Sequence, residues 1–322
     1  MKHVLLIVRI AFASGLFSWF FVQCNPAAAI SLLLKISPVA IVLVLCIDCL
    51  AILVGTYKWK LLLPEINIYK LFNISMIGRF YSFVLPGQIA GEAVKAYYLG
   101  KDVSDIHKIS ASVIVDKITG FIGTITVGIA GVFLSGTFIF NGIILYLISA
   151  IFGLLLLLSL MRTTDLQHWF SGIMNKMRMK QKGIIGMIIS NLTKLFQSWT
   201  YFINKTNRLI FNIILGICFQ GLGILIVTIL ARSIGICLSF FTWSWVFGIV
   251  VIAMLFPITI AGLGIREGIL IGILGMLSIT REKALAISLL ILALQVFSVT
   301  IGGIFEIVRT VRKRVNGPDY LH

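Results

Sequence analysis

The sequence predicts an all-α protein that crosses a membrane several times, and three observations lead to this fold class. Hydrophobic residues make up 59% of the 322 residues and charged residues only 12%, whereas soluble domains have about 45–50% and about 25%. The apolar residues gather in runs of about 20, the length that a helix needs to span a bilayer. Lys and Arg outnumber Asp and Glu by 27 to 11 and cluster between the apolar runs, giving a net charge of +16. We therefore exclude a soluble globular protein, a disordered chain and a fibrous repeat.

Six apolar runs are long enough to be full spans. They are Val4–Val22, Pro38–Thr56, Ser110–Leu134, Phe138–Met161, Leu209–Ala231 and Ala284–Val308. The first run begins like a signal peptide, but Arg9 interrupts it and no clean small-residue cleavage site follows. We therefore predict that it is a retained helix.

Basic residues between the runs predict the orientation of the spans, because cytoplasmic loops are enriched in Lys and Arg. The stretch 162–208 carries eight basic residues against Asp165 alone, and further basic residues lie at 58–70 and 309–314. The connections at 135–137 and 232–242 carry almost no charge. This pattern predicts a multi-pass protein of the cell (inner) membrane with both termini in the cytoplasm.

Two further segments, 71–99 and 245–279, are apolar but interrupted by Pro, Gly and charged residues. In the predicted orientation the first begins and ends on the cytoplasmic side and the second on the external side. Each is therefore a re-entrant hairpin or a pair of short spans, and the two insert from opposite faces. The motif Pro-x-x-Ile-Ala-Gly occurs in both, at 86–91 and 257–262. Opposite insertion with a shared motif is typical of an inverted repeat; a chance match of a short motif is the alternative.

These elements predict a single membrane domain over residues 1–322. Its first half, 1–161, contains segment 71–99, and its second half, 209–322, contains segment 245–279. The basic cytoplasmic loop between them, 162–208, includes an amphipathic helix, because apolar residues recur with helical spacing from Ile188 to Ile203. We expect this helix to lie on the lipid headgroups, or alternatively to pack on the loops of the bundle.

Charged residues beside the two breaks predict the functional site. A charge at the bilayer centre costs about 2.5–3.5 kcal/mol, and interrupted backbone is tolerated at that depth only where it lines a cavity or protein interior. Helix N-termini at such breaks also attract anions. The breaks contain Pro86, Gly87, Gly91, Pro257, Gly262 and Gly264.

We predict that these breaks form a hydrated basic pocket. The bases expected to bind a lipid phosphate headgroup are Arg79, Lys95 and Arg266. The acids expected to hold these bases, or to carry protons, are Glu92, Asp116 and Glu267. A purely structural network of ion pairs is the alternative.

Other motifs exclude several classes of chemistry. The chain contains no P-loop, no His-Glu-x-x-His and no Gly-x-Ser-x-Gly, and its glycines at 262–268 do not match the spacing of a dinucleotide fingerprint. The four scattered histidines give no metal cluster, and Cys46 and Cys49, although they have redox-motif spacing, lie in an apolar run where Cys acts as a small hydrophobe. We therefore expect no cofactor, no bound metal, no nucleic acid partner and no enzymatic activity. The expected partners are membrane lipids with anionic headgroups, together with a membrane enzyme under the second hypothesis below.

Three ordered motifs resemble those of a known family. They lie at 85–97 (Leu-Pro-Gly-Gln-Ile-Ala-Gly-Glu-Ala-Val-Lys-Ala-Tyr), at 111–120 around Asp116-Lys117, and at 257–268. Together they resemble the lysylphosphatidylglycerol synthase transmembrane-domain family, also called flippase-like membrane proteins. Gln88 and Ala90 stand where that family often has Gly. The resemblance implies movement of lipids between leaflets, sometimes with a fused aminoacyl-lipid synthase. This chain ends at His322, shortly after its last predicted span, so we expect no synthase activity.

The leading hypothesis is a flippase-like transporter that moves an anionic or phosphate-containing lipid between leaflets. Because no ATPase motif is present, transport would be downhill or coupled to an ion. The second hypothesis is a lipid-binding membrane scaffold that does not transport but positions a glycosyltransferase or a lipid synthase.

Overall fold

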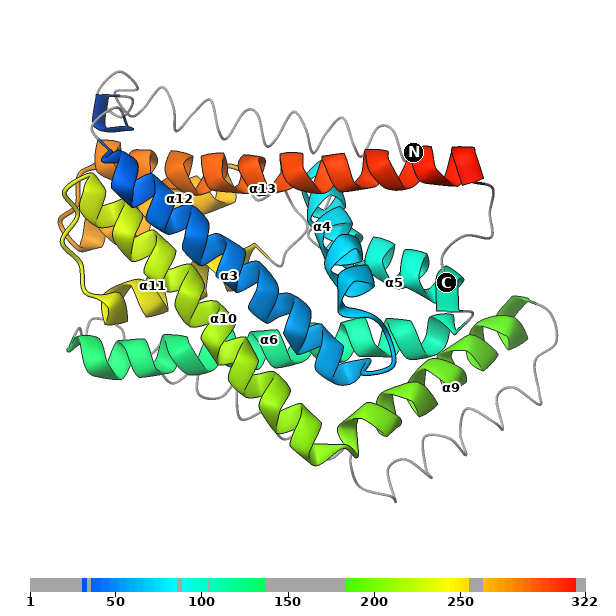
Figure 1. The fold of residues 1–322 in the computed structure, drawn as a ribbon. Helices are drawn as coiled ribbons and strands as arrows, with labels where there is room; N and C mark the ends of the chain where they lie inside the picture. Colours follow the sequence, from blue (N-terminus) through cyan, green and yellow to red (C-terminus); the bar gives the residue numbers. More distant parts are fainter. Residues whose placement is uncertain are drawn as a thin grey trace.

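The computed structural model describes residues 31–33, 36–85, 89–103, 105–136, 184–254 and 263–316. Within these ranges every regular element is a helix and no strand occurs (Figure 1). The all-α class predicted from the sequence is confirmed.

Four helices are long and apolar enough to cross a membrane. They are α3 (Pro38–Leu62), α6 (Ile106–Ser135), α10 (Thr206–Ser233) and α13 (Arg281–Asn316). Helix α6 shows why such helices begin and end where they do. Asp105 accepts a hydrogen bond from the Lys108 amide at its start, and Gly136 follows its end in a left-handed conformation with φ of 66°.

These helices coincide with four of the six predicted spans. The remaining two, Val4–Val22 and Phe138–Met161, lie outside the described residues.

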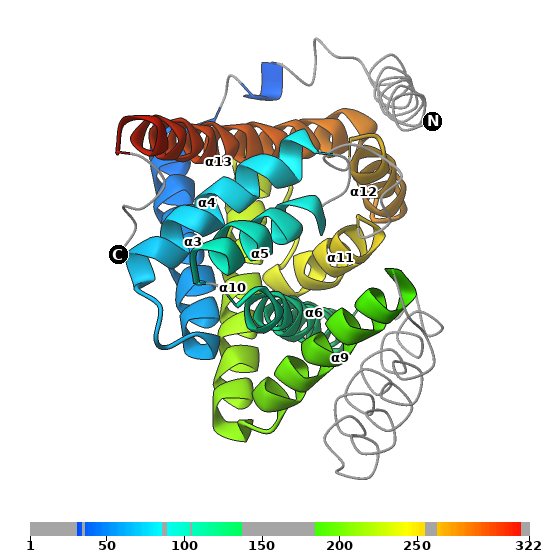
Figure 2. The same ribbon diagram turned by 90° about the vertical axis from the view of Figure 1, so that its right-hand side faces the viewer.

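The two interrupted segments form pairs of short helices. The first pair is α4 (Ile68–Val84) with α5 (Ile89–Val103), and the second is α11 (Phe240–Ala253) with α12 (Ile265–Met276). These helices have 17, 15, 14 and 12 residues, fewer than the roughly 20 of a full span. Within each pair the helices pack against each other (Figure 2).

Glycine allows the close approach of α4 and α5. A β-carbon at Gly91 would lie 2.1 Å from the carbonyl oxygen of Gly78 and 1.9 Å from the Ser82 hydroxyl. In the second pair, Gly264 precedes α12 with φ of 88°, which favours glycine. The other predicted break residues, Pro86, Gly87, Pro257 and Gly262, lie outside the described residues.

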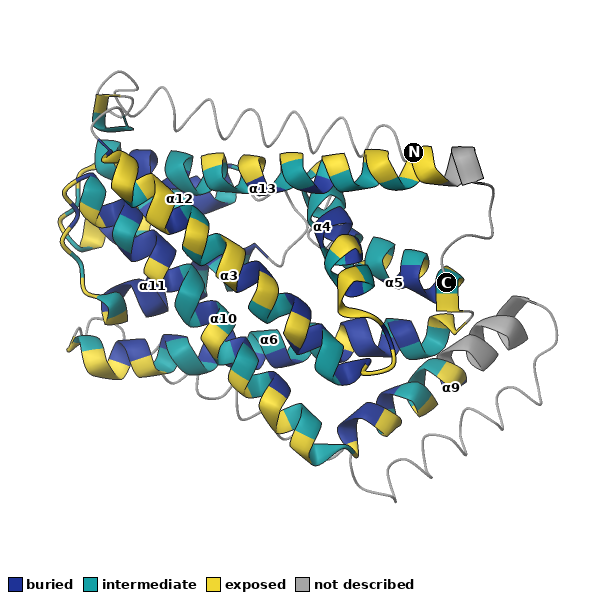
Figure 3. Cartoon of the chain, viewed as in Figure 1, coloured by how far each residue is buried: buried dark blue, intermediate teal, exposed yellow. Residues whose placement is uncertain are grey.

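Two hydrophobic clusters hold the helices together. One is built mainly from α10, α11, α12 and α13 around Trp243 and Trp245, and the other from α3 to α6 and α9 around Trp59. Large apolar side chains are nevertheless exposed along α3 and α13, among them Leu43 and Phe297 (Figure 3). An exposed apolar surface of this kind suits contact with lipid chains rather than water.

Helix α9 (Ile184–Ile203) is the predicted amphipathic helix. Its C-terminal part packs on the bundle, where Trp199, Phe202 and Ile203 are buried in the cluster around Trp59. For this part the structure favours the alternative, packing on the bundle, over burial of the apolar face in headgroups. The side chains of 184–192 are outside the described set.

Candidate functional site

A cavity of about 240 Å³ lies among α3, α4, α5, α6, α10 and α11. At roughly 30 Å³ for each water molecule, it has room for about eight waters or a small polar group. Four cationic and two acidic side chains line it, which gives a net charge of +2. These side chains are Lys58, Arg79, Lys95, Lys117, Glu92 and Asp116.

The structure therefore brings together four of the six charged residues that the sequence predicted for the pocket. Arg79 and Lys95 are predicted bases, and Glu92 and Asp116 are predicted acids; all four line the cavity. Helical spacing accounts for part of this arrangement, because residues 92 and 95, and residues 116, 120 and 124, share helix faces. Glycine accounts for another part, since a β-carbon at Gly78 would lie 2.6 Å from Cγ of Lys95.

Lys58 and Asp116 form a nearly buried ion pair across α3 and α6. The Lys58 Nζ donates a hydrogen bond of 2.8 Å to Asp116 Oδ1 and a second to the Asp116 carbonyl. The exposed fractions of the two side chains are 5% and 18%. Our sequence reasoning placed Lys58 in a cytoplasmic connection, whereas α3 continues to Leu62 and carries Lys58 into the cavity wall.

Glu92 connects two bases at the other side of the cavity. Its carboxylate lies 2.6 Å from Lys95 Nζ and 3.4 Å from Lys117 Nζ. The Lys95 ammonium also lies 5.1 Å from the centre of the Trp59 ring, close enough for a cation–π interaction. The Lys117 side chain is 36% exposed, more than any other charged lining side chain for which a salt bridge is measured. Lys117 is therefore the most accessible of these charged lining residues.

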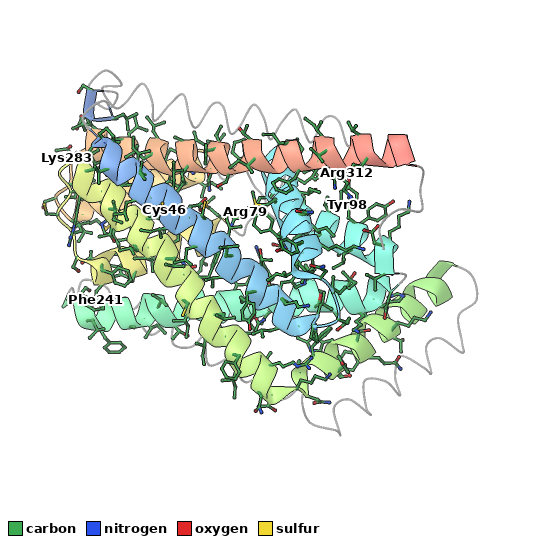
Figure 4. The ribbon with its side chains drawn as sticks, in the orientation of Figure 1. Cys46, Arg79, Tyr98, Phe241, Lys283 and Arg312 are labelled. Atoms are coloured by element: carbon green, nitrogen blue, oxygen red, sulfur yellow. The ribbon has the colours of Figure 1, made fainter. Side chains whose placement is uncertain are left out.

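Arg79 differs from the other lining cations because its guanidinium has no partner among the residues that the structure describes. It lines the cavity and makes no hydrogen bond or ion pair within 4 Å with any residue that the structure describes. Asp48 and Glu92 act on it only through longer-range electrostatics, and Asp48 already accepts a hydrogen bond of 2.8 Å from Ser298. Figure 4 places Arg79 near the middle of the bundle. None of the described residues therefore uses its five N–H donors, and they can serve a guest.

Arg266 and Glu267 lie elsewhere, which corrects the expectation that they share this pocket. Their side chains are 1% and 0% exposed and form an ion pair of 2.7 Å. Ser288 donates a hydrogen bond to Glu267, and Arg266 donates one of 2.8 Å to Gln295. Both partners are on α13, so the pair fastens α12 to α13. Because these polar atoms are buried and already hydrogen-bonded, they are not accessible to a lipid headgroup.

The structure also adds lining residues that our sequence reasoning did not assign to the site, among them Lys58, Lys117 and Gln220. Lys117 could have been found as the base that follows Asp116, but nothing in the sequence singles out Gln220. Among the described residues, no three His, Cys, Asp or Glu side chains come together in the way that a metal site requires.

Of three comparisons with known proteins, one gives a match. The family described as "Lysylphosphatidylglycerol synthase TM region" matches residues 6–303, a range that contains every residue of the cavity. Comparisons with curated proteins and with solved structures give no match.

Proposed function

The chain belongs to the family of lysylphosphatidylglycerol synthase TM regions, and from this premise we propose that it moves an anionic, phosphate-containing lipid between the two leaflets of its membrane. The family indicates a membrane protein concerned with lipids. The observation that carries the proposal is Arg79, a cation that has no partner among the described residues and lines a cavity of net positive charge.

Energetics favour an anionic guest in this cavity. An unpaired charge at membrane depth costs about 2.5–3.5 kcal/mol or more, so an excess of positive charge there requires water or an anion. Arg binds phosphate through parallel charge-assisted hydrogen bonds. While the headgroup occupies the cavity, the acyl chains would stay in the hydrocarbon of the membrane, in contact with the exposed apolar faces of α3 and α13.

Transport requires the cavity to open alternately to the two sides. We infer that the α4–α5 and α11–α12 pairs insert from opposite faces and return, as in an inverted repeat whose site lies near the midplane. Support comes from the shortness of the four helices and from the cavity wall. That wall combines residues of α4 and α5 with Val251, which is close to the end of α11.

Cysteine labelling tests this topology. In a variant without the five native cysteines, single cysteines would replace Tyr69 and Lys101 at the ends of the first pair, and Phe241 and Thr280 beside the second; all four positions are exposed. A membrane-impermeant maleimide should label the first two only from the cytoplasmic side and the last two only from the outside. Labelling of all four positions from one side would contradict opposite insertion.

The energy source of transport is a separate part of the proposal. Glu92 and Asp116 are the carboxylates in the cavity, and we propose them as proton carriers if transport is coupled to protons. Glu267 is less suited to that role, because it is fully buried and bonded to Arg266 and Ser288.

Reconstitution into liposomes tests the function itself. Fluorescent anionic phospholipid in the outer leaflet is quenched with dithionite, and the fraction that becomes accessible reports flipping. Arg79→Gln removes hydrogen bonds to a charged group worth about 1.5–3 kcal/mol, so flipping should fall about ten- to a hundredfold. Arg312→Gln, at an exposed position near the end of α13, is the matched control and should flip like the wild type.

Two results would count against the proposal. Equal flipping by the wild type and Arg79→Gln would refute the assignment of the site. Stable lipid binding and copurification with a membrane enzyme, without any flipping, would favour the scaffold hypothesis instead.

A further inference from the structure

Gln220 carries an unpartnered hydrogen-bond donor in the wall of the same cavity. The residue lies on α10 and is only 6% exposed. Its Oε1 accepts a hydrogen bond of 3.2 Å from the Thr124 hydroxyl, whereas its Nε2 is buried and has no partner among the described residues. A buried amide donor without a partner is rare in proteins, because it loses the hydrogen bonds that it made to water. The group is therefore a candidate donor to whatever occupies the cavity, whether water or a headgroup.

Arg79 presents unused donors to the same cavity from α4. Of the cavity-lining atoms that the structure describes, the only buried side-chain nitrogen or oxygen without a partner is the donor of Gln220, and no buried acceptor lacks one. A guest that satisfies Gln220 and Arg79 must therefore present oxygen acceptors to them. An amine or another cationic group would be repelled by Arg79 and would leave both donors unpaired.

The charge of the cavity limits the guest further. Lys58 and Asp116 neutralise each other, and Glu92 is shared between Lys95 and Lys117. With Arg79 included, the lining keeps a net charge of +2. Asp48 does not line the cavity, although its charge acts on Arg79. A phosphate monoester carries about −1.5 to −2 at pH 7 because its second pKa is about 6, whereas a phosphodiester carries a single negative charge.

We propose that the lipid is a phosphomonoester whose terminal, doubly charged phosphate accepts hydrogen bonds from Arg79 and from Gln220 Nε2; this inference rests on the proposed function and names its substrate class. A monoester has no substituent beyond the phosphate, so its free oxygens can reach both donors. A monoester phosphate offers three unesterified oxygens and close to two negative charges, whereas a diester offers two such oxygens and one charge. Gln220 is then a specificity residue that distinguishes bare phosphate from larger headgroups.

Lipid binding to the purified protein in nanodiscs tests the substrate class. The probes are dioleoyl phosphatidic acid, phosphatidylglycerol and phosphatidylethanolamine, titrated at pH 8 and at pH 5. At pH 8 phosphatidic acid should bind at least about tenfold tighter than phosphatidylglycerol, a difference of about 1.4 kcal/mol. At pH 5, where the monoester loses its second charge, the two affinities should converge. Phosphatidylethanolamine should bind most weakly.

Variants of Gln220 test its role. Gln220→Leu keeps the approximate size but removes the N–H donor, and Thr124 still reaches the Gly120 carbonyl at 3.1 Å. The preference for phosphatidic acid should fall about tenfold. Gln197→Leu, at an exposed position of α9, is the matched control and should keep the wild-type preference. If Gln220→Leu does not fold, Gln220→Glu serves the same purpose, because its carboxylate repels the phosphate and should abolish the preference.

The outcomes separate the two proposals. Equal binding of phosphatidic acid and phosphatidylglycerol by the wild type, with flipping intact, would overturn the phosphomonoester inference and leave the transport function standing. A wild-type preference in Gln220→Leu would overturn the role of Gln220. The absence of both binding and flipping for every anionic lipid would overturn the proposed function, and this inference with it.

Discussion

Replacing Glu267 with Gln tests whether the Arg266–Glu267 pair stabilises the fold or binds substrate. The Glu267 carboxylate accepts hydrogen bonds from the Gly264 amide at 2.6 Å, from Arg266 at 2.7 Å and from Ser288 at 2.7 Å. The substitution leaves the Arg266 guanidinium 1% exposed and without a countercharge. Breaking a buried pair in this way costs about 3–5 kcal/mol, which is large beside net stabilities of about 5–15 kcal/mol.

The assay is unfolding of the purified protein in mixed micelles by increasing SDS, followed by the fluorescence of buried tryptophans such as Trp243 and Trp245. Glu267→Gln should lower the free energy of unfolding by about 3–5 kcal/mol. The double variant Arg266→Met/Glu267→Leu removes both charges and should recover at least half of the loss, because a buried ion pair replaced by apolar groups is often neutral. Lys194→Gln, at an exposed position of α9, is the control and should change stability by less than about 0.5 kcal/mol.

A loss of less than about 1 kcal/mol in Glu267→Gln would refute this reasoning, since that is the range of ordinary substitutions. So would a double variant as unstable as the single one. If flipping per folded molecule fell in Glu267→Gln while stability stayed unchanged, the result would support the original assignment of Arg266 to the headgroup site.

Three further predictions follow from the packing and the charges. A β-carbon at Gly302 would lie 2.3 Å from a carbonyl oxygen of α4, so Gly302→Ala should cost about 1–3 kcal/mol by overpacking; a thermal unfolding curve identical to that of the wild type would contradict this. Asp116→Asn frees Lys58 from its ion pair and raises the positive charge of the cavity, so more anionic lipid should be retained on purification, as mass spectrometry can measure; reduced retention would argue against an anion site. Partial burial raises the pKa of the Glu65 carboxyl, but the hydrogen bond and charge of Lys108 outweigh it and hold that pKa below its ordinary value of 4.5. The contact should therefore stabilise the folded protein above about pH 4.5, and this stabilisation should be lost as the pH falls further. Its size should be less than about 1 kcal/mol. Glu65→Gln should abolish this pH dependence when the free energy of unfolding is measured across that pH range.

Composition and run length were sufficient to predict the helical class and the four described spans, because the apolar length of a helix is a local property of the chain. The interruptions at 71–99 and 245–279 were also predictable, since Pro and Gly act on the backbone where they stand. The end of α3 was less predictable. The apolar run stops at Thr56, but the helix continues to Leu62, and Lys58 in this last part pairs with a residue 58 positions away.

For the site, the sequence alone identified charges that are too costly to leave unpaired in a membrane, and four of them line the cavity. Only the tertiary structure decided which charges meet. In it, Arg266 and Glu267 form a buried ion pair, Glu92 forms ion pairs with two lysines, and Gln220 lines the cavity. The reason is physical: hydropathy and helical spacing depend on neighbours along the chain, whereas ion pairs and unsatisfied donors depend on how separate helices pack.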